Sequence, residues 1–147
     1  MIYIACDHAG YKTKLAVMKY LQKKSIQFVD LGVDSEKKSS NYALVANSLC
    51  PLITEEDAGI LICGTGIGMS IACNRFNNIR GALCYDVKSA RLARKHNDAN
   101  VLILRGRRGL NCTKKRIVKT FFSTAFEGGR HVERLMAIGT NKQLYNS

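Results

Sequence analysis

Short apolar segments alternate with longer amphipathic ones from one end of the chain to the other. The short segments have the length and composition of buried β-strands, and the longer ones repeat apolar residues at helical spacing. We expect strands near residues 2–6, 26–31, 58–63, 80–85 and 100–104. We expect helices near residues 10–24, 42–53, 69–76, 87–96, 113–125 and 131–143. This alternation predicts an α/β protein whose repeated βα units form a mostly parallel sheet.

The length and charge of the chain narrow the classes of protein to consider. With 147 residues, 46% of them hydrophobic, the chain can bury one ordinary core, so we expect a single domain over residues 1–147. The net charge of +12 would suit a nucleic-acid binder, but the basic residues are spread along the chain and are denser only from 105 to 119. No recognised nucleic-acid-binding motif accompanies them. We therefore expect a solubilising basic surface, a few arginines that bind an anionic substrate, and no nucleic-acid partner.

The cysteines and the N-terminus bear on metal binding and compartment. Six cysteines, at positions 6, 50, 63, 73, 84 and 112, form no Cys-x-x-Cys pair, and no histidines stand at zinc-ligand spacing, so we expect no metal site. The first apolar run meets Asp7 too early for a signal peptide, and no apolar run approaches the length of a membrane span. The sequence thus predicts a cytoplasmic protein with reduced thiols and no membrane partner.

A glycine-rich loop between the strand at 58–63 and the next helix is the strongest local signal. Its sequence is Cys63-Gly64-Thr65-Gly66-Ile67-Gly68. Glycines at alternate positions let backbone N–H groups approach a ligand, and the helix N-terminus favours negative charge. The loop is not a Walker A motif, since no Gly-Lys-Ser/Thr ends it, nor a dinucleotide fingerprint, since Met69 stands where the third glycine is needed. We expect it to hold an oxyanion or a polar sugar.

Side chains that could transfer protons accompany this loop, each with a structural alternative. A thiol at a strand end near a helix N-terminus favours its thiolate form, so Cys63 is a candidate base or nucleophile, or else a small buried hydrophobe. Thr65 donates its hydroxyl to a substrate oxygen or merely satisfies the turn. His96 is a candidate general acid or base, or a cation stabilised by the end of its helix. Asn97, which follows His96, is interpreted here only as a candidate helix C-cap.

Polar residues that follow successive strands are expected to meet, because ligands of parallel sheets bind where the strands end. An acid, an imidazole, a thiol and a group of guanidiniums would thereby gather at one edge of the sheet. The residues are Asp7-His8, Cys63 with its glycines, Tyr85-Asp86 and the segment 105–108.

The last expected helix carries a second group of cations. Arg130 and Arg134 are four residues apart and share one face of the helix, which suggests a phosphate receiver. Glu133 and Glu127 offer a surface ion-pair network as the alternative. The two glycines at 128–129 read as a hinge that carries the helix away from the rest of the domain, and His131 has no evident role.

Four blocks of the sequence together resemble one known family. The blocks are Cys6-Asp7-His8-Ala9-Gly10, Cys63-Gly64-Thr65-Gly66-Ile67-Gly68-Met69-Ser70, His96-Asn97-Asp98-Ala99-Asn100-Val101-Leu102 and Glu127-Gly128-Gly129-Arg130-His131. From about residue 2 to residue 138 the chain is similar to the ribose-5-phosphate isomerase B family, which includes galactose-6-phosphate and allose-6-phosphate isomerases. The resemblance implies a Rossmann-like three-layer α/β/α sandwich with a five-stranded parallel sheet. It also implies a homodimer or a dimer of dimers with shared active sites and no cofactor.

The resemblance further implies a role for each candidate residue. Cys63 would be the base that moves a proton between C1 and C2 of the sugar, and His96 would open the furanose ring. The enediolate would be held by Gly64, Thr65, Gly66, Ile67 and Gly68. The sugar would be bound by Asp7, His8 and Asn97, and the phosphate by Arg107, Arg130 and Arg134. His96, Asn97 and the arginines would come from the neighbouring subunit, to which the helix at about 130–143 would reach.

Two departures from the family pattern bear on the substrate. Where the family has Tyr-Pro-Asp-Tyr-Ala, this chain has Ser39-Ser40-Asn41-Tyr42-Ala43, so an aromatic wall of the sugar pocket is expected to be missing. Where the family has Leu-Gly-Ala-Arg, this chain has Leu104-Arg105-Gly106-Arg107 followed by Arg108. Arg107 aligns best, and Arg105 or Arg108 could share its task.

The resemblance implies an aldose–ketose isomerase that interconverts ribose 5-phosphate and ribulose 5-phosphate in the pentose phosphate pathway. The nearest rival performs the same chemistry on allose 6-phosphate or galactose 6-phosphate. A non-catalytic protein that binds a sugar phosphate or a nucleic acid is the alternative from another class. Cys63, Thr65 and His96 together favour an enzyme, because a binding protein would not need all three.

Overall fold

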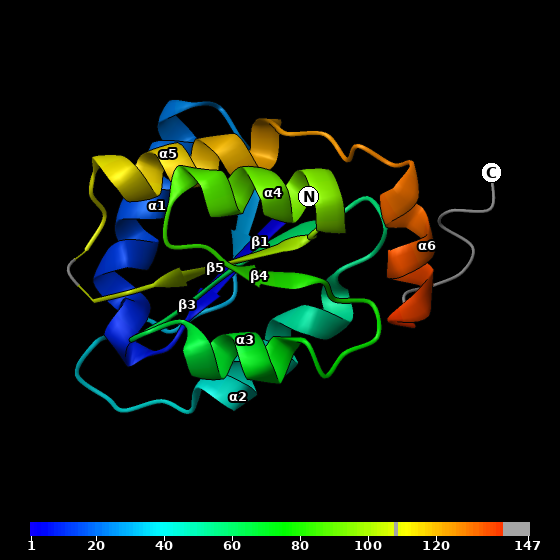
Figure 1. Cartoon of the computed structure of the whole chain (residues 1–147). Coiled ribbons are helices and arrows are strands. Elements are labelled where there is room, and N and C mark those ends of the chain that lie inside the picture. The colour runs from blue at the N-terminus through cyan, green and yellow to red at the C-terminus, as the bar shows by residue number, and fades with distance from the viewer. Residues whose placement is uncertain (108, 140–147) are drawn as a thin grey trace.

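The computed structural model describes residues 1–107 and 109–139 of the chain (Figure 1). The strands are β1 (Ile2–Cys6), β2 (Phe28–Asp30), β3 (Ala58–Cys63), β4 (Gly81–Leu83) and β5 (Val101–Arg105). The helices are α1 (Tyr11–Lys23), α2 (Tyr42–Leu49), α3 (Ile67–Cys73), α4 (Val87–Asn97), α5 (Cys112–Ser123) and α6 (Arg130–Ala137). Two short 3-10 helices are η1 (His8–Gly10) and η2 (Cys50–Leu52). Every strand and helix that the sequence predicts is therefore present.

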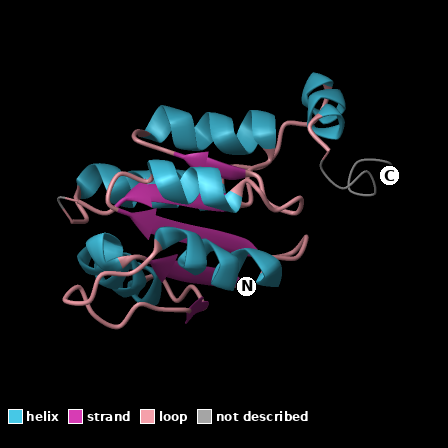
Figure 2. Ribbon diagram, turned by 90° about the horizontal axis from the view of Figure 1, so that it is seen from below, coloured by secondary structure: helices cyan, strands magenta, loops and turns pink. Residues whose placement is uncertain are grey.

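The strands form one parallel sheet in the order β2-β1-β3-β5-β4. Figure 2 shows the strand arrows side by side, with their heads toward the same end of the molecule. β3 lies at the centre, where Cys6 is opposite Ile62 and Cys63 is opposite Arg105. The ends of β1, β3 and β5 are thus aligned, so the residues that follow them lie at one edge of the sheet.

Helices cover both faces of this sheet, which confirms the expected three-layer α/β/α architecture (Figure 1). α1, α4 and α5 pack on one face around a core that includes Leu21, Ala93 and Phe121. α2 and α3 pack on the other face around Leu49 and Met69. Burial on both sides explains why the central strands are nearly continuous apolar runs. None of the helices in the described part of the chain has the length and apolar character needed to cross a membrane.

The two helical layers differ in charge. Within their bounds, α1, α4 and α5 each carry four Lys or Arg residues and no Asp or Glu. α2 and α3 carry no charged residue within theirs, and Leu44, Ile67 and Ile71 are exposed on them. The helical surface on one side of the sheet is therefore cationic, whereas the surface on the other side is uncharged and partly apolar.

Several elements are shorter than the sequence predicts. The strands expected at 26–31 and 80–85 are reduced to β2 and β4, which form the two edges of the sheet. The helix expected over 42–53 ends at Leu49, because Pro51 in the following 3-10 turn cannot donate the N–H that an α-helix would need there. The last helix ends at Ala137, and Gly139 follows it with a φ of +78°, as is common after a helix. Residues 140–143 of the expected helix, and Arg108, lie outside the described residues.

A buried ion pair fixes the edge strand β2 against α1. Lys14 is only 1% exposed, and its Nζ donates to both carboxylate oxygens of Asp30, at 2.7 and 2.8 Å, and to the carbonyl of Val33 at 2.9 Å. An ammonium withdrawn from water needs such partners, since an unpaired buried charge is strongly destabilising. The segment that leads from β2 toward the site is held in this way.

Candidate active site

The glycine-rich loop joins the end of β3 to the start of α3 and has little room for side chains. Gly66 has a φ of +84°, and a Cβ there would lie 2.4 Å from the Leu83 side chain. A Cβ on Gly68 would lie 2.7 Å from the ring of Tyr42, which covers the first turn of α3. The N–H groups of that first turn have no acceptor within the helix. The loop is therefore close-packed from outside and presents backbone donors, as an anion-binding turn does.

Cys63 lies at the base of this loop with its side chain 4% exposed. Its Sγ accepts a hydrogen bond from the Gly66 N–H at 3.2 Å, a contact that stabilises negative charge on sulfur. Burial raises the pKa of four other thiols, Cys6 and Cys84 to about 11 and Cys50 and Cys73 to about 12. These four thiols therefore remain protonated near neutral pH and act as small apolar residues of the core.

Thr65 and Tyr85 close one side of the loop. The Thr65 hydroxyl oxygen accepts from the Ile67 N–H at 3.2 Å, so it does satisfy the turn. Its own proton is not used by that bond and can be donated to a ligand. The Tyr85 hydroxyl donates to the Thr65 carbonyl at 3.2 Å, and the guanidinium of Arg105 lies 5.5 Å from the centre of the Tyr85 ring.

A cavity of about 380 Å³ opens beside the loop. Its lining residues are Gly64, Thr65, Ile67, Tyr85, Arg105 and Arg107. The Arg107 N–H donates to the Gly64 carbonyl at 3.4 Å, and the Arg107 side chain lies against Gly64, whose missing Cβ would be 3.3 Å from Nε. Arg107 therefore lies next to the Cys63 loop of its own chain. The family resemblance had led us to expect that Arg107, like the other arginines, would come from the neighbouring subunit.

Asp7 and His8 follow β1 at the same edge, as predicted. Asp7 is 6% exposed, and its carboxylate accepts from the Gly10 N–H at 3.0 Å, which caps η1. His8 is held by Ser40, whose hydroxyl accepts from the His8 N–H at 2.8 Å and whose own N–H donates to the His8 Nδ1 at 3.2 Å. A neutral His8 ring thus carries its proton on Nε2, which is free to donate. His8 and Arg107 line a second hollow of about 320 Å³.

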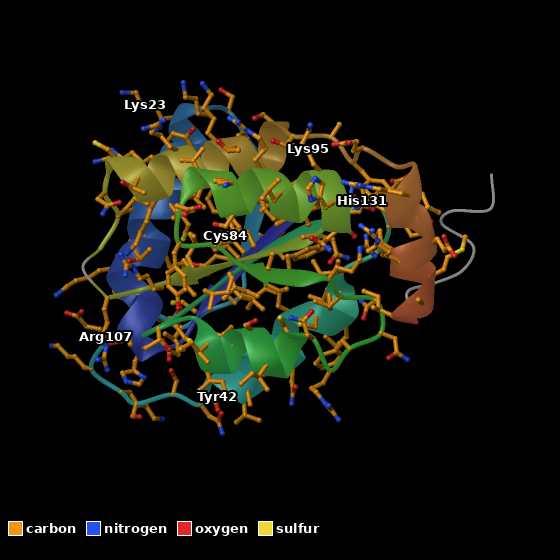
Figure 3. The ribbon with its side chains drawn as sticks, in the orientation of Figure 1. Lys23, Tyr42, Cys84, Lys95, Arg107 and His131 are labelled. Atoms are coloured by element: carbon orange, nitrogen blue, oxygen red, sulfur yellow. The ribbon has the colours of Figure 1, made fainter. Side chains whose placement is uncertain are left out.

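The remaining candidates lie at the other end of the molecule. His96 and Asn97 end α4, and a helix that follows one strand and precedes the next returns to the edge where strands begin. Figure 3 shows Arg107 and His131 on opposite sides of the molecule. One chain therefore brings together Asp7, His8, the Cys63 loop and Arg107, but not His96, Asn97, Arg130 and Arg134.

His96 has a partner that the sequence did not suggest. Its ring stacks on the ring of His131 with the centroids 4.3 Å apart and an interplanar angle of 12°. His131 is 4% exposed, and its Nε2 has no hydrogen-bond partner among the described residues. Burial, together with the positive charges of His96, Arg130 and Arg134, lowers the pKa of His131. Residues 35 positions apart show no periodic signal, so only the motif block that contains His131 could have pointed to it.

The last turn of α4 is bonded to the segment that precedes α6. The Glu127 N–H donates to the Lys95 carbonyl at 3.0 Å, and the Glu127 carboxylate pairs with the Lys95 ammonium at 3.1 Å. In the described part of the chain Glu127 thus pairs with Lys95 rather than with Arg130 or Arg134, which are both exposed. Asp98, with a φ of +42°, is the C-cap of α4, so the alternative role expected of Asn97 is wrong.

Metal ligands are not grouped anywhere in residues 1–107 and 109–139, where no three His, Cys, Asp or Glu side chains are placed to share an ion. The donors that the geometry does gather are a thiol, backbone N–H groups, a hydroxyl, an imidazole and guanidiniums. They suit proton transfer next to an anionic oxygen.

Comparisons with known proteins agree with this chemistry. A family model described as Ribose/Galactose Isomerase matches residues 2–138. A putative sugar phosphate isomerase of Rickettsia bellii is 46% identical over 139 residues, which cover 93% of this chain and 96% of that protein. Ribose-5-phosphate isomerase B of Escherichia coli is 38% identical over 148 residues, which cover 99% and 98% of the two chains.

Solved structures give the same result. A ribose 5-phosphate isomerase from Thermotoga maritima superposes with a TM-score of 0.89 at 48% identity, covering 94% of this chain and 96% of that one. Ribose-5-phosphate isomerase B from Mycoplasma genitalium, solved with bound ribulose-5-phosphate, superposes with a TM-score of 0.85 at 36% identity, covering 99% and 97%.

The environment of His131 predicts how stability depends on pH. Because its pKa is lowered in the folded state, the unfolded chain binds more protons than the folded one as the pH falls below the ordinary histidine pKa of about 6.5. We expect the melting temperature to decrease as the pH is lowered from 7.5 to 5.5. His131→Phe should make this decrease smaller, since phenylalanine keeps the stacked ring but does not titrate. An unchanged pH dependence in the variant would show that His131 is not its source.

Proposed function

This chain belongs to the ribose/galactose isomerase family, and we propose that it interconverts ribose 5-phosphate and ribulose 5-phosphate as an aldose–ketose isomerase. The observation that carries the proposal is the Cys63 thiol, fixed by the Gly66 N–H at the base of a glycine-rich loop and beside a cavity lined by two arginines. A base, donors for an oxyanion and cations for a phosphate are what this reaction needs within reach of one another.

The proposed reaction is a proton transfer between neighbouring carbons. Cys63, as a thiolate, takes the proton from C2 of the open-chain aldose and returns it to C1 of the enediolate, so the thiol acts as base and then as acid. In the same step the hydroxyl proton passes from O2 to O1 of the sugar. Negative charge develops on the sugar oxygens in between. The first-turn N–H groups of α3 and the Thr65 hydroxyl are placed to stabilise it.

Substrate positioning is the proposed role of the other residues at this edge. Arg107 binds the phosphate, and Arg105, which lines the same cavity, shares that charge. The free Nε2–H of His8 and the carboxylate of Asp7 face the sugar hydroxyls. Binding energy from the distant phosphate then holds C1 and C2 against the thiol.

We further propose that a second copy of the chain completes each site. His96 opens the furanose ring, Asn97 binds the sugar, and Arg130 and Arg134 bind the phosphate, all from the neighbouring subunit. Two observations support this: these residues lie at the end of the chain opposite to Cys63, and α2 and α3 present an uncharged face with exposed Leu44 and Ile71. Ile67, also exposed there, lines the cavity, so a partner on this face reaches the site. A symmetric dimer then holds two complete sites.

The place of action proposed for this enzyme is the cytoplasm. Its six cysteines are all unpaired, and five of them are buried, which fits a reducing compartment.

A six-carbon substrate is the second candidate, and one observation favours it. Ser39 and Ser40 stand where the family has an aromatic residue and a proline, and Ser40 is used to hold His8. The sugar pocket of this chain would then lack the aromatic wall that the family pattern implies, and a larger sugar would have more room.

Substrate preference is tested by assaying the purified protein on ribose 5-phosphate, allose 6-phosphate and galactose 6-phosphate. We expect kcat/KM to be highest for ribose 5-phosphate by about tenfold or more, the discrimination available from one extra carbon group in a fitted pocket. A preference for a hexose phosphate would move the assignment to the second candidate. Turnover of none of the three would favour a non-catalytic binding protein.

The role of the thiol is tested by Cys63→Ala. We expect the turnover rate to fall about a thousandfold, equivalent to about 4 kcal/mol in the barrier, while binding of ribose 5-phosphate, measured by calorimetry, persists. The matched control is Cys112→Ala, which removes the exposed thiol at the start of α5 and should leave the rate unchanged. A Cys63→Ala enzyme within about tenfold of the parent would remove Cys63 from the mechanism.

The shared site is tested by co-expressing two variants, Cys63→Ala and Arg134→Ala, each of which should be impaired as a homodimer. Random pairing makes about half of the dimers mixed, and each mixed dimer has one intact site. About a quarter of the activity of the unsubstituted enzyme should therefore return. Cys63→Ala mixed with Arg107→Ala is the control: both residues lie at the same end of one chain, so no site is repaired. A verified mixed dimer of the first pair that remains inactive contradicts the shared site.

A further inference from the structure

Lys114 is a buried cation that the proposed reaction does not use. It lies in the first turn of α5 and is 5% exposed. With Ile117, Val118 and Phe121 it makes up the inward face of that helix, where an apolar residue is expected. Within residues 1–107 and 109–139 no Asp or Glu pairs with it. Burial, with a smaller contribution from Arg105, lowers the pKa of Lys114, as expected for an ammonium withdrawn from water.

The ammonium is held by two backbone carbonyls of the segment that carries Arg107. Lys114 Nζ donates to the carbonyl of Arg107 at 3.1 Å and to the carbonyl of Gly109. Its own backbone N–H donates to the Asn111 side chain at 2.9 Å, so Asn111 caps α5 and places Lys114 under the segment. Bonds from a charged donor to a carbonyl are stronger than neutral ones, particularly when buried.

Other bonds hold the same segment from the opposite side. The Gly106 N–H donates to the carbonyl of Cys63 at 2.7 Å, and the hydroxyl of buried Thr13 donates to the carbonyl of Gly106 at 2.6 Å. The N–H of Arg107 donates to the carbonyl of Gly64 at 3.4 Å. The backbone of Arg107 is thus fixed at its N–H by the Cys63 loop and at its carbonyl by Lys114.

We propose that Lys114 is a positioning residue for the anion site: by binding the Arg107 carbonyl, it holds the Arg107 guanidinium in the cavity beside the Cys63 loop, where the phosphate of the substrate binds. The inference rests on the proposed function, in which Arg107 receives that phosphate. Arg107 is itself exposed and has a long, flexible side chain, so its starting point on the backbone decides how often the guanidinium lies in the cavity. The buried ammonium also adds positive charge below the cavity, in a region of low dielectric constant.

The test is Lys114→Met, which removes the ammonium but keeps an unbranched side chain of similar length. We expect KM for ribose 5-phosphate and the inhibition constant of inorganic phosphate to rise together by about tenfold, the lower end of the range for loss of a group that orients a metal ligand. The change in kcat should stay within about twofold, because Arg105 and the proposed Arg130 and Arg134 of the neighbouring subunit still hold the phosphate once the substrate is bound. Lys115→Met is the matched control: it removes an exposed lysine one position away and should change neither constant.

A second arm separates positioning from a general effect on the fold. In an Arg107→Ala background, Lys114→Met should have no further effect on the inhibition constant of phosphate, because the group that it positions is already absent. If Lys114→Met does not fold, Lys114→Gln, whose amide can still donate to one carbonyl, should raise the same two constants by a smaller factor. Constants in either Lys114 variant that equal those of Lys115→Met overturn the inference.

The same measurements distinguish this inference from the proposed function. If Arg107→Ala leaves phosphate inhibition unchanged, the assignment of Arg107 to the phosphate is wrong, and the positioning role falls with it. If Arg107→Ala weakens phosphate binding and Lys114→Met does not, the proposed function stands and only the role of Lys114 is rejected.

Discussion

The parallel pairing of β3 with β5 is the constraint on which the rest of this site depends. It places Cys63 opposite Arg105, so the loops that leave the two strands must run side by side. Two bonds then join these loops, the Gly106 N–H to the Cys63 carbonyl and the Arg107 N–H to the Gly64 carbonyl. Within the loop that follows β3, the Gly66 N–H holds the Cys63 sulfur. A thiol, a turn of backbone donors and the backbone of Arg107 are thereby fixed relative to one another by these bonds. Such bonds tolerate almost any side chain elsewhere in the two loops, but they depend on the register of the sheet.

The same parallel topology explains why one chain does not bring all of the candidate residues together. In a sheet of this kind every helix between two strands returns toward the edge where strands begin, so residues at the end of α4 cannot meet residues at the end of β3. α6 lies at that far end as well, held there by the contact of Glu127 with Lys95. Any mechanism that uses both Cys63 and His96 must therefore involve more than one copy of the chain.

Much of the fold could be predicted from the sequence because its signals are local. Apolar runs marked the strands, helical spacing marked the helices, and strand ends predicted the meeting of Asp7, His8 and Cys63. Edge strands and helix ends were misplaced, since pairing on only one side shortened β2 and β4 and Pro51 ended α2 early. The individual roles of the site residues came from a family resemblance and remain predictions.

What the sequence could not predict are contacts between distant residues of unusual chemistry. Lys14 and Lys114 are charged, and their residue type points to the surface, yet partners 16 residues away in one case and a neighbouring backbone in the other allow them to be buried. The stacking of His96 on His131 joins residues 35 positions apart, and its only trace in the sequence is that both belong to recognisable motifs. Tyr42 was seen only as part of an altered motif, whereas in the structure its ring packs where a Cβ of residue 68 would lie.

The unequal charge of the two helical layers has a consequence for colloidal behaviour. In the proposed dimer, paired through the uncharged layer of α2 and α3, the helices α1, α4 and α5 of both copies face outward, and the pair carries twice the formal charge of +12. Dimers so covered repel one another, which keeps them dispersed at low ionic strength and opposes further stacking of the faces. Salt shortens the range of this repulsion to about 8 Å at physiological ionic strength. The arrangement of lysines and arginines thus favours a limited assembly over an open-ended one.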